Sequence, residues 1–262
     1  MKIGIFDSGL GGLSVLNEAL SKLSEHKFLY YADVKNVPYG QKSRDEILKF
    51  SFDAVKFLIE NGAKAVVVAC NTATSVAIKE LRANLNVPII GMEPAVKKAH
   101  DLSHNDALKT LVIATPVTVN GAKLKELIAN LHAKDKTELL ALPRLVNFAE
   151  NGEFDTENVK SYLKEELAKF DLSKFGFLVL GCTHFNYFKD SLREILPSNI
   201  SIIDGNEGTI NRLISEIGLK ISTLDQAPKV RFFYSGDEVF SKFELDKISR
   251  NLTHLEKMRA IC

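Results

Sequence analysis

The sequence has few cysteines, almost no charge imbalance and no long hydrophobic run. Among its 262 residues are three cysteines, and this low, odd number argues against a disulfide-stabilised scaffold. With 34 basic and 33 acidic residues the net charge is +1, so neither nucleic acid nor an anionic membrane surface is expected as a partner. No apolar run approaches the roughly 18 residues of a membrane span. The amino-terminal MKIGIFDSG lacks the features of a signal peptide, so we expect a cytoplasmic protein.

Metal-binding and phosphate-binding patterns are also missing. No CxxC or histidine-rich spacing occurs, so the sequence predicts no metal site. The glycine-rich segment Asp7–Gly12 lacks the Lys-Ser/Thr of a phosphate loop. Its glycine spacing also departs from the dinucleotide fingerprint, so it gives no support for a nucleotide cofactor.

Short apolar runs alternate with longer amphipathic stretches along the chain. The runs are predicted strands: Ile3–Phe6, Val66–Ala69, Val87–Ile90, Leu111–Ala114, Phe177–Leu180 and Ile200–Ile203. The predicted helices between them include Arg44–Glu60, Thr74–Asn84, Ala122–His132 and Thr156–Phe170. This alternation predicts an α/β fold with mostly parallel sheets and helices on both faces, that is, three layers.

The two halves of the chain resemble each other. VVVACNT (Val66–Thr72) aligns with LVLGCTH (Leu178–His184), and the predicted strands before and after each also match. Asp7 precedes Cys70 by 63 residues, and Thr115 precedes Cys182 by 67. Three matching strands in the same order indicate a duplicated α/β unit. We therefore predict two similar domains related by a pseudo-two-fold axis, with the active site in the cleft between them.

The domain limits follow from this duplication. The first domain is predicted to comprise residues 1–93 plus 206–262, and the second residues 94–205. The tail, with a predicted helix at Glu207–Ile217, a strand at Val230–Tyr234 and a helical stretch after Asp237, is assigned to the first domain.

Polar residues follow the predicted strands at equivalent points in the two halves. They are Asp7-Ser8, Cys70-Asn71-Thr72, Thr115 and Cys182-Thr183-His184. Ligands of open parallel sheets bind beyond the carboxyl ends of the strands, and helix amino termini there favour anions. The pattern predicts a site for a carboxylate or another small anion, flanked by two thiols if the two exits face each other.

Two opposed thiols suit racemisation. A racemase removes a proton from one face of a carbon and delivers one to the other face. A free thiol has a pKa of about 8.5, so little thiolate exists at neutral pH without a nearby positive charge or helix amino terminus. A carboxylate could accept the thiol proton. Asp7 near Cys70 and His184 near Cys182 are candidates for these roles.

Each of these features also has a purely structural explanation. A cysteine at a strand end can be a small buried hydrophobic residue. Asp7 could cap the next helix, and His184 could be an ordinary residue at a helix start. Several other candidates could be loop or surface residues without a role, namely Asp33, the turn Pro38-Tyr39-Gly40, Glu150 beside Asn151-Gly152, and the terminal Cys262.

Five motifs in order along the chain resemble the cofactor-independent glutamate racemases. They are FDSGLGGLSV (Phe6–Val15), PYG (Pro38–Gly40), ACNTAT (Ala69–Thr74), IIGMEPA (Ile89–Ala95) and GCTHF (Gly181–Phe185). As a set they are highly specific and cover essentially the whole chain. The resemblance implies two α/β domains that enclose the substrate, and interconversion of L- and D-glutamate for peptidoglycan synthesis. It also implies that neither pyridoxal phosphate nor a metal is used.

The resemblance implies a role for each matched residue. Cys70 is expected to take the α-proton from D-glutamate, and Cys182 from L-glutamate. Asp7 and His184 are the implied helpers, with Asp33 and Glu150 as supporting acids. The implied substrate-binding residues are Asp7, Ser8, Tyr39, Gly40, Asn71, Thr72, Thr183 and His184, with Thr115 and Thr118 as additions. We expect the chain to form a homodimer. We expect its binding partner to be the small-molecule substrate, L- or D-glutamate.

The second half departs from the family pattern. Where many members have Thr-x-x-Ser-x-x-Tyr, this chain has Thr118, Gly121 and Leu124, and the Cys-Pro and Val-Pro pairs before Glu150 become Leu142-Pro143 and Val146-Asn147. These changes concern the rim of the cleft and the role of Glu150. The chain begins at its first strand, without the extension that some members link to activation by a peptidoglycan precursor. We therefore expect no such regulation.

Three other functions fit part of the pattern. An aspartate or hydantoin racemase would share the two-cysteine arrangement. A cysteine hydrolase using Cys182 and His184 would leave Cys70 and the duplication unexplained. A small-anion binding module or an interaction protein would bind a ligand without exchanging its protons.

Overall fold

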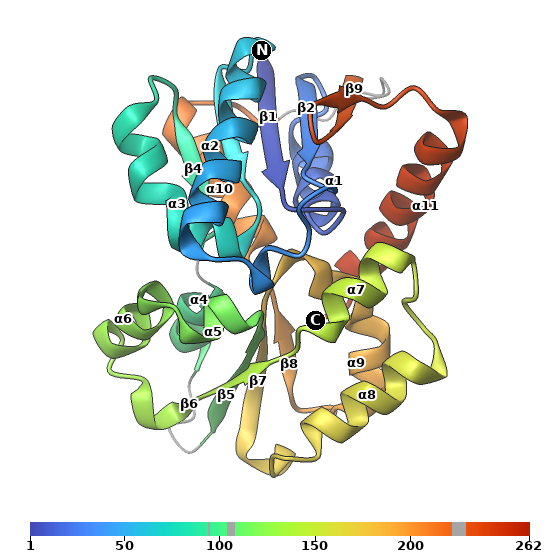
Figure 1. Ribbon diagram of the computed structural model, residues 1–262. Coiled ribbons are helices and arrows are strands. Elements are labelled where there is room, and N and C mark those ends of the chain that lie inside the picture. Colours follow the sequence, from blue (N-terminus) through green and yellow to red (C-terminus); the bar gives the residue numbers. More distant parts are fainter. Residues whose placement is uncertain (94, 104–107, 222–228) are drawn as a thin grey trace.

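The fold contains two mostly parallel sheets, each covered by helices. The structure is a computed structural model that describes residues 1–93, 95–103, 108–221 and 229–262. A six-stranded sheet has the order β10-β9-β2-β1-β3-β4, and a four-stranded sheet has the order β6-β5-β7-β8. The two sheets lie in separate units, the upper and lower halves of Figure 1. The predicted α/β class is confirmed.

The first sheet takes its strands from both ends of the chain. They are β1 (Lys2–Asp7), β2 (Lys27–Ala32), β3 (Ala65–Val68), β4 (Ile89–Gly91), β9 (Lys229–Tyr234) and β10 (Asp237–Glu238). Only β10 runs antiparallel, on β9. β9 pairs with β2 along its whole length, which brings residues 229–234 beside the amino-terminal half of the chain.

The second sheet repeats the central part of the first. Its strands are β5 (Lys109–Ala114), β6 (Thr137–Ala141), β7 (Phe175–Gly181) and β8 (Ser201–Ile203). The parallel order β6-β5-β7-β8 corresponds to β2-β1-β3-β4 in the first sheet. The repeated unit therefore has four strands, one more than the sequence comparison found. β6 is hard to recognise because it is an edge strand with only Leu140 buried, whereas β2 is a continuous buried apolar run, Phe28–Ala32, that the sequence analysis overlooked.

The helices of the first unit are α1 (Leu13–Lys22), η1 (Tyr39–Gln41), α2 (Arg44–Glu60), α3 (Asn71–Asn84), α10 (Asn206–Ile217) and α11 (Lys242–Arg259). α2 has the predicted limits, because a capping box between Ser43 and Glu46 fixes its start. α3 begins three residues before the predicted Thr74. Cys70 acts as its N-cap, with Sγ accepting a hydrogen bond from the N–H of Ala73 at 3.4 Å.

The second unit has more and shorter helices. They are α4 (Ala95–Leu102), α5 (Pro116–Asn120), α6 (Ala122–Asn130), η2 (Lys134–Lys136), α7 (Arg144–Asn151), α8 (Glu157–Leu167), η3 (Leu172–Lys174), η4 (Thr183–Phe188) and α9 (Lys189–Ile195). Gly152 ends α7 in the left-handed conformation, with φ of 77°. None of the helices in the described ranges combines the length and apolarity needed to cross a membrane.

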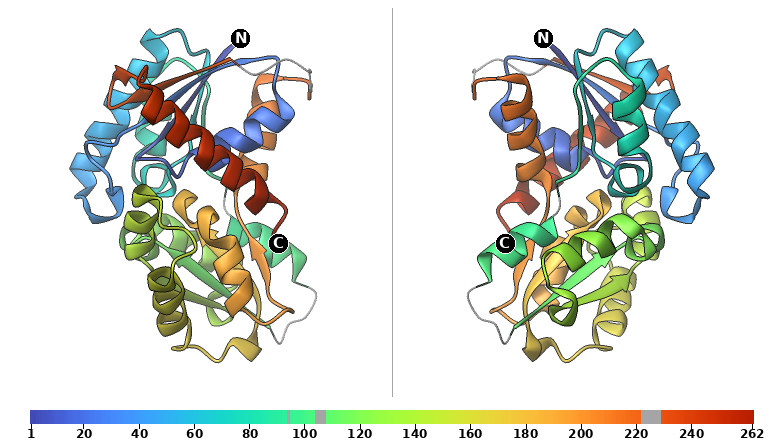
Figure 2. Two further views of the ribbon diagram at one scale, coloured as in Figure 1. Left: turned by 90° about the vertical axis from the view of Figure 1, so that its right-hand side faces the viewer. Right: turned by 90° about the vertical axis from the view of Figure 1, so that its left-hand side faces the viewer.

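The chain passes between the two units twice, after β4 and after β8. α10 then packs on α1, and α11 packs on both α1 and η4, so α11 reaches from the first unit to the second (Figure 2). We propose that residues 1–93 plus 206–262 form the first domain and residues 94–205 the second. Pro94, at this proposed boundary, lies outside the described residues.

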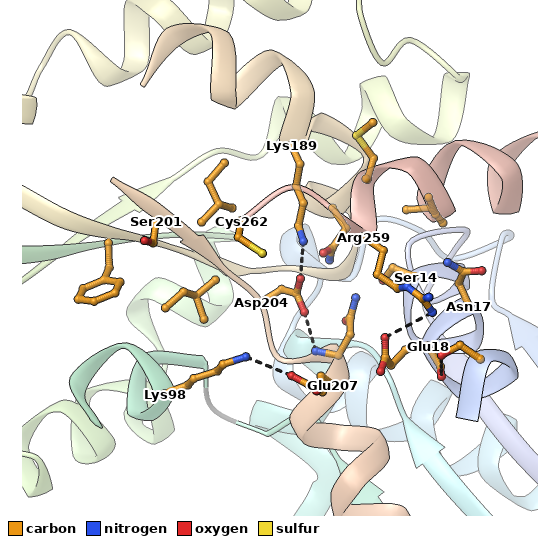
Figure 3. Close-up of a pocket in the computed structure, with 18 of the residues that line it drawn as sticks. Ser14, Asn17, Glu18, Lys98, Lys189, Ser201, Asp204, Glu207, Arg259 and Cys262 are labelled. Carbon is orange, nitrogen blue, oxygen red and sulfur yellow. Dashed lines mark hydrogen bonds and ion pairs between the residues drawn. The ribbon is translucent and has the colours of Figure 1, made fainter. Parts of the chain in front are cut away.

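A cavity of about 620 Å³ lies beside the second crossover. Figure 3 shows Lys189 directed at Asp204 and Lys98 directed at Glu207, at 2.7 and 3.3 Å. The first pair ties α9 to the segment after β8, and the second joins α4 to α10 across the two units. None of the residues predicted to bind substrate lines this cavity, so it is separate from the candidate site.

Candidate active site

Residues at the carboxyl ends of the strands in one unit contact residues at the carboxyl ends of the strands in the other unit. Asp7 ends β1, and its Oδ2 accepts a hydrogen bond from Oγ1 of Thr183, which follows β7, at 3.0 Å. Thr72, just after β3, has its Oγ1 3.0 Å from Oγ1 of Thr115, which follows β5. All four residues are buried. The site therefore lies between the units, where β1 points toward the lower half of Figure 1.

Glycines allow this close approach. A Cβ on Gly9 would overlap Oε1 of Glu150, and a Cβ on Gly11 would lie 2.5 Å from Nδ1 of His184. In the same way, a Cβ on Gly40 would lie 2.7 Å from Cβ of Thr115. Each added atom would push the two units apart. The glycines of the Asp7–Gly12 segment thus admit side chains of the opposite unit.

Cys70 is connected to Asp7 through Ser8. Cys70 is 5 % exposed, and its thiol lies 3.6 Å from Oγ of Ser8, to which it can donate a hydrogen bond. The Ser8 hydroxyl lies 3.5 Å from Oδ1 of Asp7. Asp7 does not cap the next helix, as the structural alternative supposed, because the N-cap of α1 is Gly12. The Asp7 Oδ1 instead accepts the N–H of Gly9 at 2.9 Å.

Burial controls the protonation of this side of the site. Burial and then the negative charge of Asp7 raise the pKa of the Cys70 thiol to about 12, although the N–H of Ala73 acts in the opposite direction. Burial also raises the pKa of Asp7, although the charge of His184 and the N–H of Gly9 oppose this shift. At neutral pH Cys70 is therefore a thiol, and Asp7 is a better proton acceptor than an exposed aspartate.

Cys182 has a different neighbour, a histidine. Sγ of Cys182 lies 3.8 Å from Nδ1 of His184, and Nε2 of His184 lies 2.6 Å from Oε1 of Glu150. Burial lowers the pKa of His184, but hydrogen bonds with Cys182 and Glu150, and their charges, outweigh it and raise this pKa well above 6.5. His184 is therefore an imidazolium at neutral pH and places a positive charge and a proton beside the sulfur.

Glu150 is not a solvated turn residue, so that structural alternative is wrong. Its side chain is only 17 % exposed, because α7 directs it into the contact between the units. Oε1 accepts the N–H of Leu10 at 2.7 Å in addition to its contact with His184. A single carboxylate oxygen thus joins the histidine to the backbone of the first unit.

Hydroxyl and amide groups gather near Cys70, which Asn71 and Thr72 follow directly in the chain. Thr115 Oγ1 lies 3.1 Å from Thr118 Oγ1, and Thr72 Oγ1 lies 3.4 Å from the same hydroxyl. Asn71 contributes Nδ2, a buried donor that has no hydrogen-bond partner within the described parts of the chain. Such neutral donors can bind a carboxylate without an arginine.

The Asp33 carboxylate is bound by neighbouring side chains. Its carboxylate accepts hydrogen bonds from the hydroxyls of Tyr39 at 2.7 Å and Ser235 at 2.8 Å, and from the amide of Asn36. Burial and then the charge and hydrogen bond of Asp33 raise the pKa of Tyr39. No hydrogen bond in the described structure joins Asp33 to a cysteine. Asp33 therefore orients Tyr39, and with it the turn at Gly40.

Two buried tyrosines that the sequence analysis did not select hold the segment after β1. The Tyr30 hydroxyl donates to the carbonyl of Gly9 at 2.7 Å, and the Tyr187 hydroxyl donates to the carbonyl of Leu10 at 3.0 Å. Tyr30 belongs to the first unit, whereas Tyr187 follows the GCTHF motif of the second. Apart from the position of Tyr187 just after that motif, no sequence signal marks either residue.

The arrangement can move protons. Two buried sulfurs stand at equivalent strand ends, each with its own acid–base partner, beside donors suited to a carboxylate. Within the described residues, no group of three or more His, Cys, Asp or Glu side chains is arranged to hold a metal ion.

The chain is similar to proteins of known function over its whole length. The Asp/Glu/Hydantoin racemase family model matches residues 7–213. A glutamate racemase from Campylobacter concisus (strain 13826) is 87% identical over 262 residues, which cover 100% of both chains. The crystal structure of glutamate racemase from Campylobacter jejuni subsp. jejuni superimposes with a TM-score of 0.80 at 28% identity and covers 100% of both chains. That of the Francisella tularensis enzyme in complex with D-glutamate gives a TM-score of 0.78 at 28% identity, covering 97% of this chain and 93% of that chain.

Proposed function

The chain belongs to the Asp/Glu/Hydantoin racemase family, and from this membership we propose that it interconverts L- and D-glutamate by a two-cysteine proton transfer at Cα, without a cofactor. Glutamate is the substrate named for the relatives that share the whole length of this chain. The observation that carries the mechanism is that Cys70 and Cys182 follow equivalent strands, β3 and β7, and that the threonine after each strand contacts the opposite unit: Thr72 contacts Thr115, and Thr183 contacts Asp7. Each sulfur has its own proton-handling partner.

In the L-to-D direction, Cys182 removes the α-proton and Cys70 delivers a proton to the opposite face. The starting protonation supports this direction, because Cys70 is a thiol and Cys182 lies beside the imidazolium of His184. In the reverse direction His184 returns its proton to Cys182, and Asp7 takes the proton of Cys70 through Ser8. The exchange needs no redox partner, because one proton is removed and one is added.

The substrate is held by the neutral donors of the site. We assign its carboxylates to Asn71, to the hydroxyls of Thr72, Thr115 and Thr118, and to the backbone around Gly40. Asp7, Ser8, Tyr39, Thr183 and His184 complete the proposed substrate contacts. Asp33 and Glu150 act as supporting acids, the first through Tyr39 and the second through His184.

The cellular role proposed with this activity is the supply of D-glutamate for peptidoglycan, in the cytoplasm and as a homodimer. It rests on the family resemblance and on the balanced charge of the chain.

The direct test is α-proton exchange in D2O with single-cysteine variants. Replacing Cys70 or Cys182 by serine should each slow racemisation by roughly a thousandfold or more, since an acid–base group contributes about 10²–10⁴-fold. C70S should still deuterate L-glutamate through Cys182, and C182S should still deuterate D-glutamate through Cys70. C262S is the control and should keep the parent rate, because Cys262 is exposed and lines the cavity beside the second crossover, which is separate from the candidate site.

Three results would reject the mechanism: no Cα deuteration by the parent protein, near-normal racemisation by either single variant, or exchange of the same enantiomer by both. A cysteine hydrolase would tolerate the loss of Cys70. Because the family name also includes aspartate and hydantoin racemases, initial rates on aspartate and a hydantoin belong in the same experiment. A clear preference for either would overturn the assignment to glutamate.

A further inference from the structure

The backbone of Leu10 is held from two sides by the opposite unit. Leu10 belongs to the segment that leaves β1, and it is 1 % exposed. Its N–H donates to Oε1 of Glu150 on α7 at 2.7 Å. Its carbonyl accepts the hydroxyl of Tyr187 in η4 at 3.0 Å. Both partners come from the second unit, so these bonds exist only while the two units are in contact.

The same bonds continue to the sulfur of Cys182. Oε1 of Glu150, which accepts the Leu10 N–H, also contacts Nε2 of His184 at 2.6 Å. Nδ1 of His184 lies 3.8 Å from Sγ of Cys182. A continuous series of contacts therefore runs from the Tyr187 hydroxyl through Leu10, Glu150 and His184 to the thiol. No corresponding contact leads from Tyr187 to Cys70 in the described structure.

The Tyr187 ring is fixed independently of its hydroxyl. It is fully buried and stacks on Phe154, with ring centroids 4.6 Å apart and an interplanar angle of 7°. Phe154 stacks in turn on His254 of α11 at 4.6 Å, and Nε2 of His254 lies 2.9 Å from the carbonyl of Tyr187. Removing only the hydroxyl should therefore leave the ring in place.

We propose that Tyr187 is a positioning residue for the Cys182 half of the reaction. By holding the carbonyl of Leu10, it keeps the Leu10 N–H on Glu150 and thereby fixes the carboxylate that orients His184 toward Cys182. A carboxylate that receives two donors on one oxygen keeps its direction, and His184 keeps its Nδ1 directed at the sulfur. This inference rests on the proposed two-cysteine mechanism.

The test measures each half-reaction separately, with Tyr187→Phe added to the two single-cysteine backgrounds. In C70S, where only Cys182 works, Y187F should slow deuteration of L-glutamate by roughly fivefold to tenfold, the effect of one lost hydrogen bond. It should do so through kcat, with KM nearly unchanged. In C182S, where only Cys70 works, Y187F should change deuteration of D-glutamate by less than about twofold.

Tyr30→Phe is the matched control. It removes the same phenol hydroxyl from the neighbouring carbonyl of Gly9, but within the first unit, and the Gly9 N–H supports Asp7. Because the Gly9 carbonyl shares its peptide group with the Leu10 N–H, Y30F should slow exchange of both enantiomers to a similar extent, in contrast to Y187F. If Y187F fails to fold, Phe154→Leu, which weakens the stack and keeps the hydroxyl, should show the same selectivity for L-glutamate with a smaller loss.

Equal slowing of both half-reactions by Y187F would show that Tyr187 only stabilises the fold and would overturn the proposal, as would no slowing of either. Failure of the two-cysteine mechanism is recognised separately. In that case C70S would not exchange L-glutamate even before Tyr187 is changed.

Discussion

The two thiols occupy equivalent positions in the repeated sheets but have different surroundings. Cys70 caps α3, a helix of 14 residues, and receives the N–H of Ala73. Cys182 precedes η4, a 3-10 helix of six residues, and its side chain caps no N–H there. It has the imidazole of His184 instead. The duplicated backbone thus fixes where the sulfurs lie, and the local side chains fix how each is protonated.

This difference suits the proposed reaction. At each moment one sulfur must act as a base and the other as an acid, so two identical environments would be a disadvantage. Burial keeps Cys70 protonated, whereas His184 brings a positive charge to Cys182. The asymmetry extends to the proposed helpers: Asp7 is connected to Cys70 through the hydroxyl of Ser8, and His184 contacts its thiol directly.

Removing one helper at a time should reveal this asymmetry most strongly. Placed in the C70S background, His184→Asn should lower exchange of L-glutamate by about 10²–10³-fold, because it removes the cation and proton source beside Cys182. Placed in the C182S background, Asp7→Asn should lower exchange of D-glutamate by about 10²-fold. Deuterium incorporation at Cα measures both.

His184→Asn in the C182S background and Asp7→Asn in the C70S background serve as comparisons. Each should lose less exchange than the same substitution in its matched background, because it removes a proposed substrate contact but not the helper of the remaining thiol. With both cysteines present, either helper variant must reduce kcat/KM equally in the two directions, because enantiomers have equal free energies. Equal loss in both half-reactions would mean that the helpers are shared rather than assigned one to each thiol.

A second, smaller effect tests how closely the two units must approach. Gly9→Ala places a methyl group against Oε1 of Glu150, so it should displace the carboxylate or part the units and lower racemisation by about 10–100-fold. Gly152→Ala is the control: φ is 77° but nothing lies within 4 Å of the added atom. It should cost about 1 kcal/mol of unfolding free energy and leave the rate unchanged. Chemical denaturation and initial rates distinguish the two, and a fully active G9A would contradict the role of close approach.

The sequence predicted the central strands of both sheets because they are continuous apolar runs, buried on both faces. The sequence analysis missed β6, an edge strand in which Thr137 and Glu138 precede only three apolar residues, and it overlooked β2, although Phe28–Ala32 is a continuous apolar run. The polar residues at the carboxyl ends of the central strands could be predicted as well, since they follow the apolar runs directly. Residues assigned by resemblance, such as Asp33, gained a physical context only from the contacts of their side chains.

The rest of the site depends on contacts between units, which one chain's local pattern does not contain. Gly9 and Gly11 predict a turn in the sequence. In the structure they also make room for Glu150 and His184, which lie more than a hundred residues away in the chain. The contact of Tyr187 with Leu10 spans 177 residues. Neither follows from composition, periodicity or capping signals.

The smallest effect concerns stability and pH on the Cys182 side. The folded pKa of His184 is raised, so its stabilising contribution is fully present below the unfolded value of about 6.5 and is lost as pH rises through the folded value. The melting temperature of the parent should therefore exceed that of His184→Asn by a few degrees near pH 6, and the gap should narrow toward alkaline pH.

Asp7, on the Cys70 side of the site, should also make stability depend on pH. Its folded pKa is raised by burial, so the parent loses stability relative to Asp7→Asn as pH rises from about 4. For both variants, the melting temperature of the parent falls relative to that of the variant as pH rises. The fall occurs at lower pH for Asp7→Asn than for His184→Asn. Thermal melts between pH 4 and 9 would measure them, and a pH-independent gap for either variant would contradict its assigned protonation.

The two crossings of the chain also set an order of assembly during synthesis. All four strands of the second sheet have left the ribosome once residue 203 has emerged, whereas the first sheet still lacks β9, its partner for β2. The nascent chain therefore holds a complete second sheet beside an unfinished first one. α11, whose His254 stacks on Phe154, arrives last of all. The contact between His254 and Phe154 can therefore form only after the strands of both sheets have been synthesised, long after the two thiols have emerged.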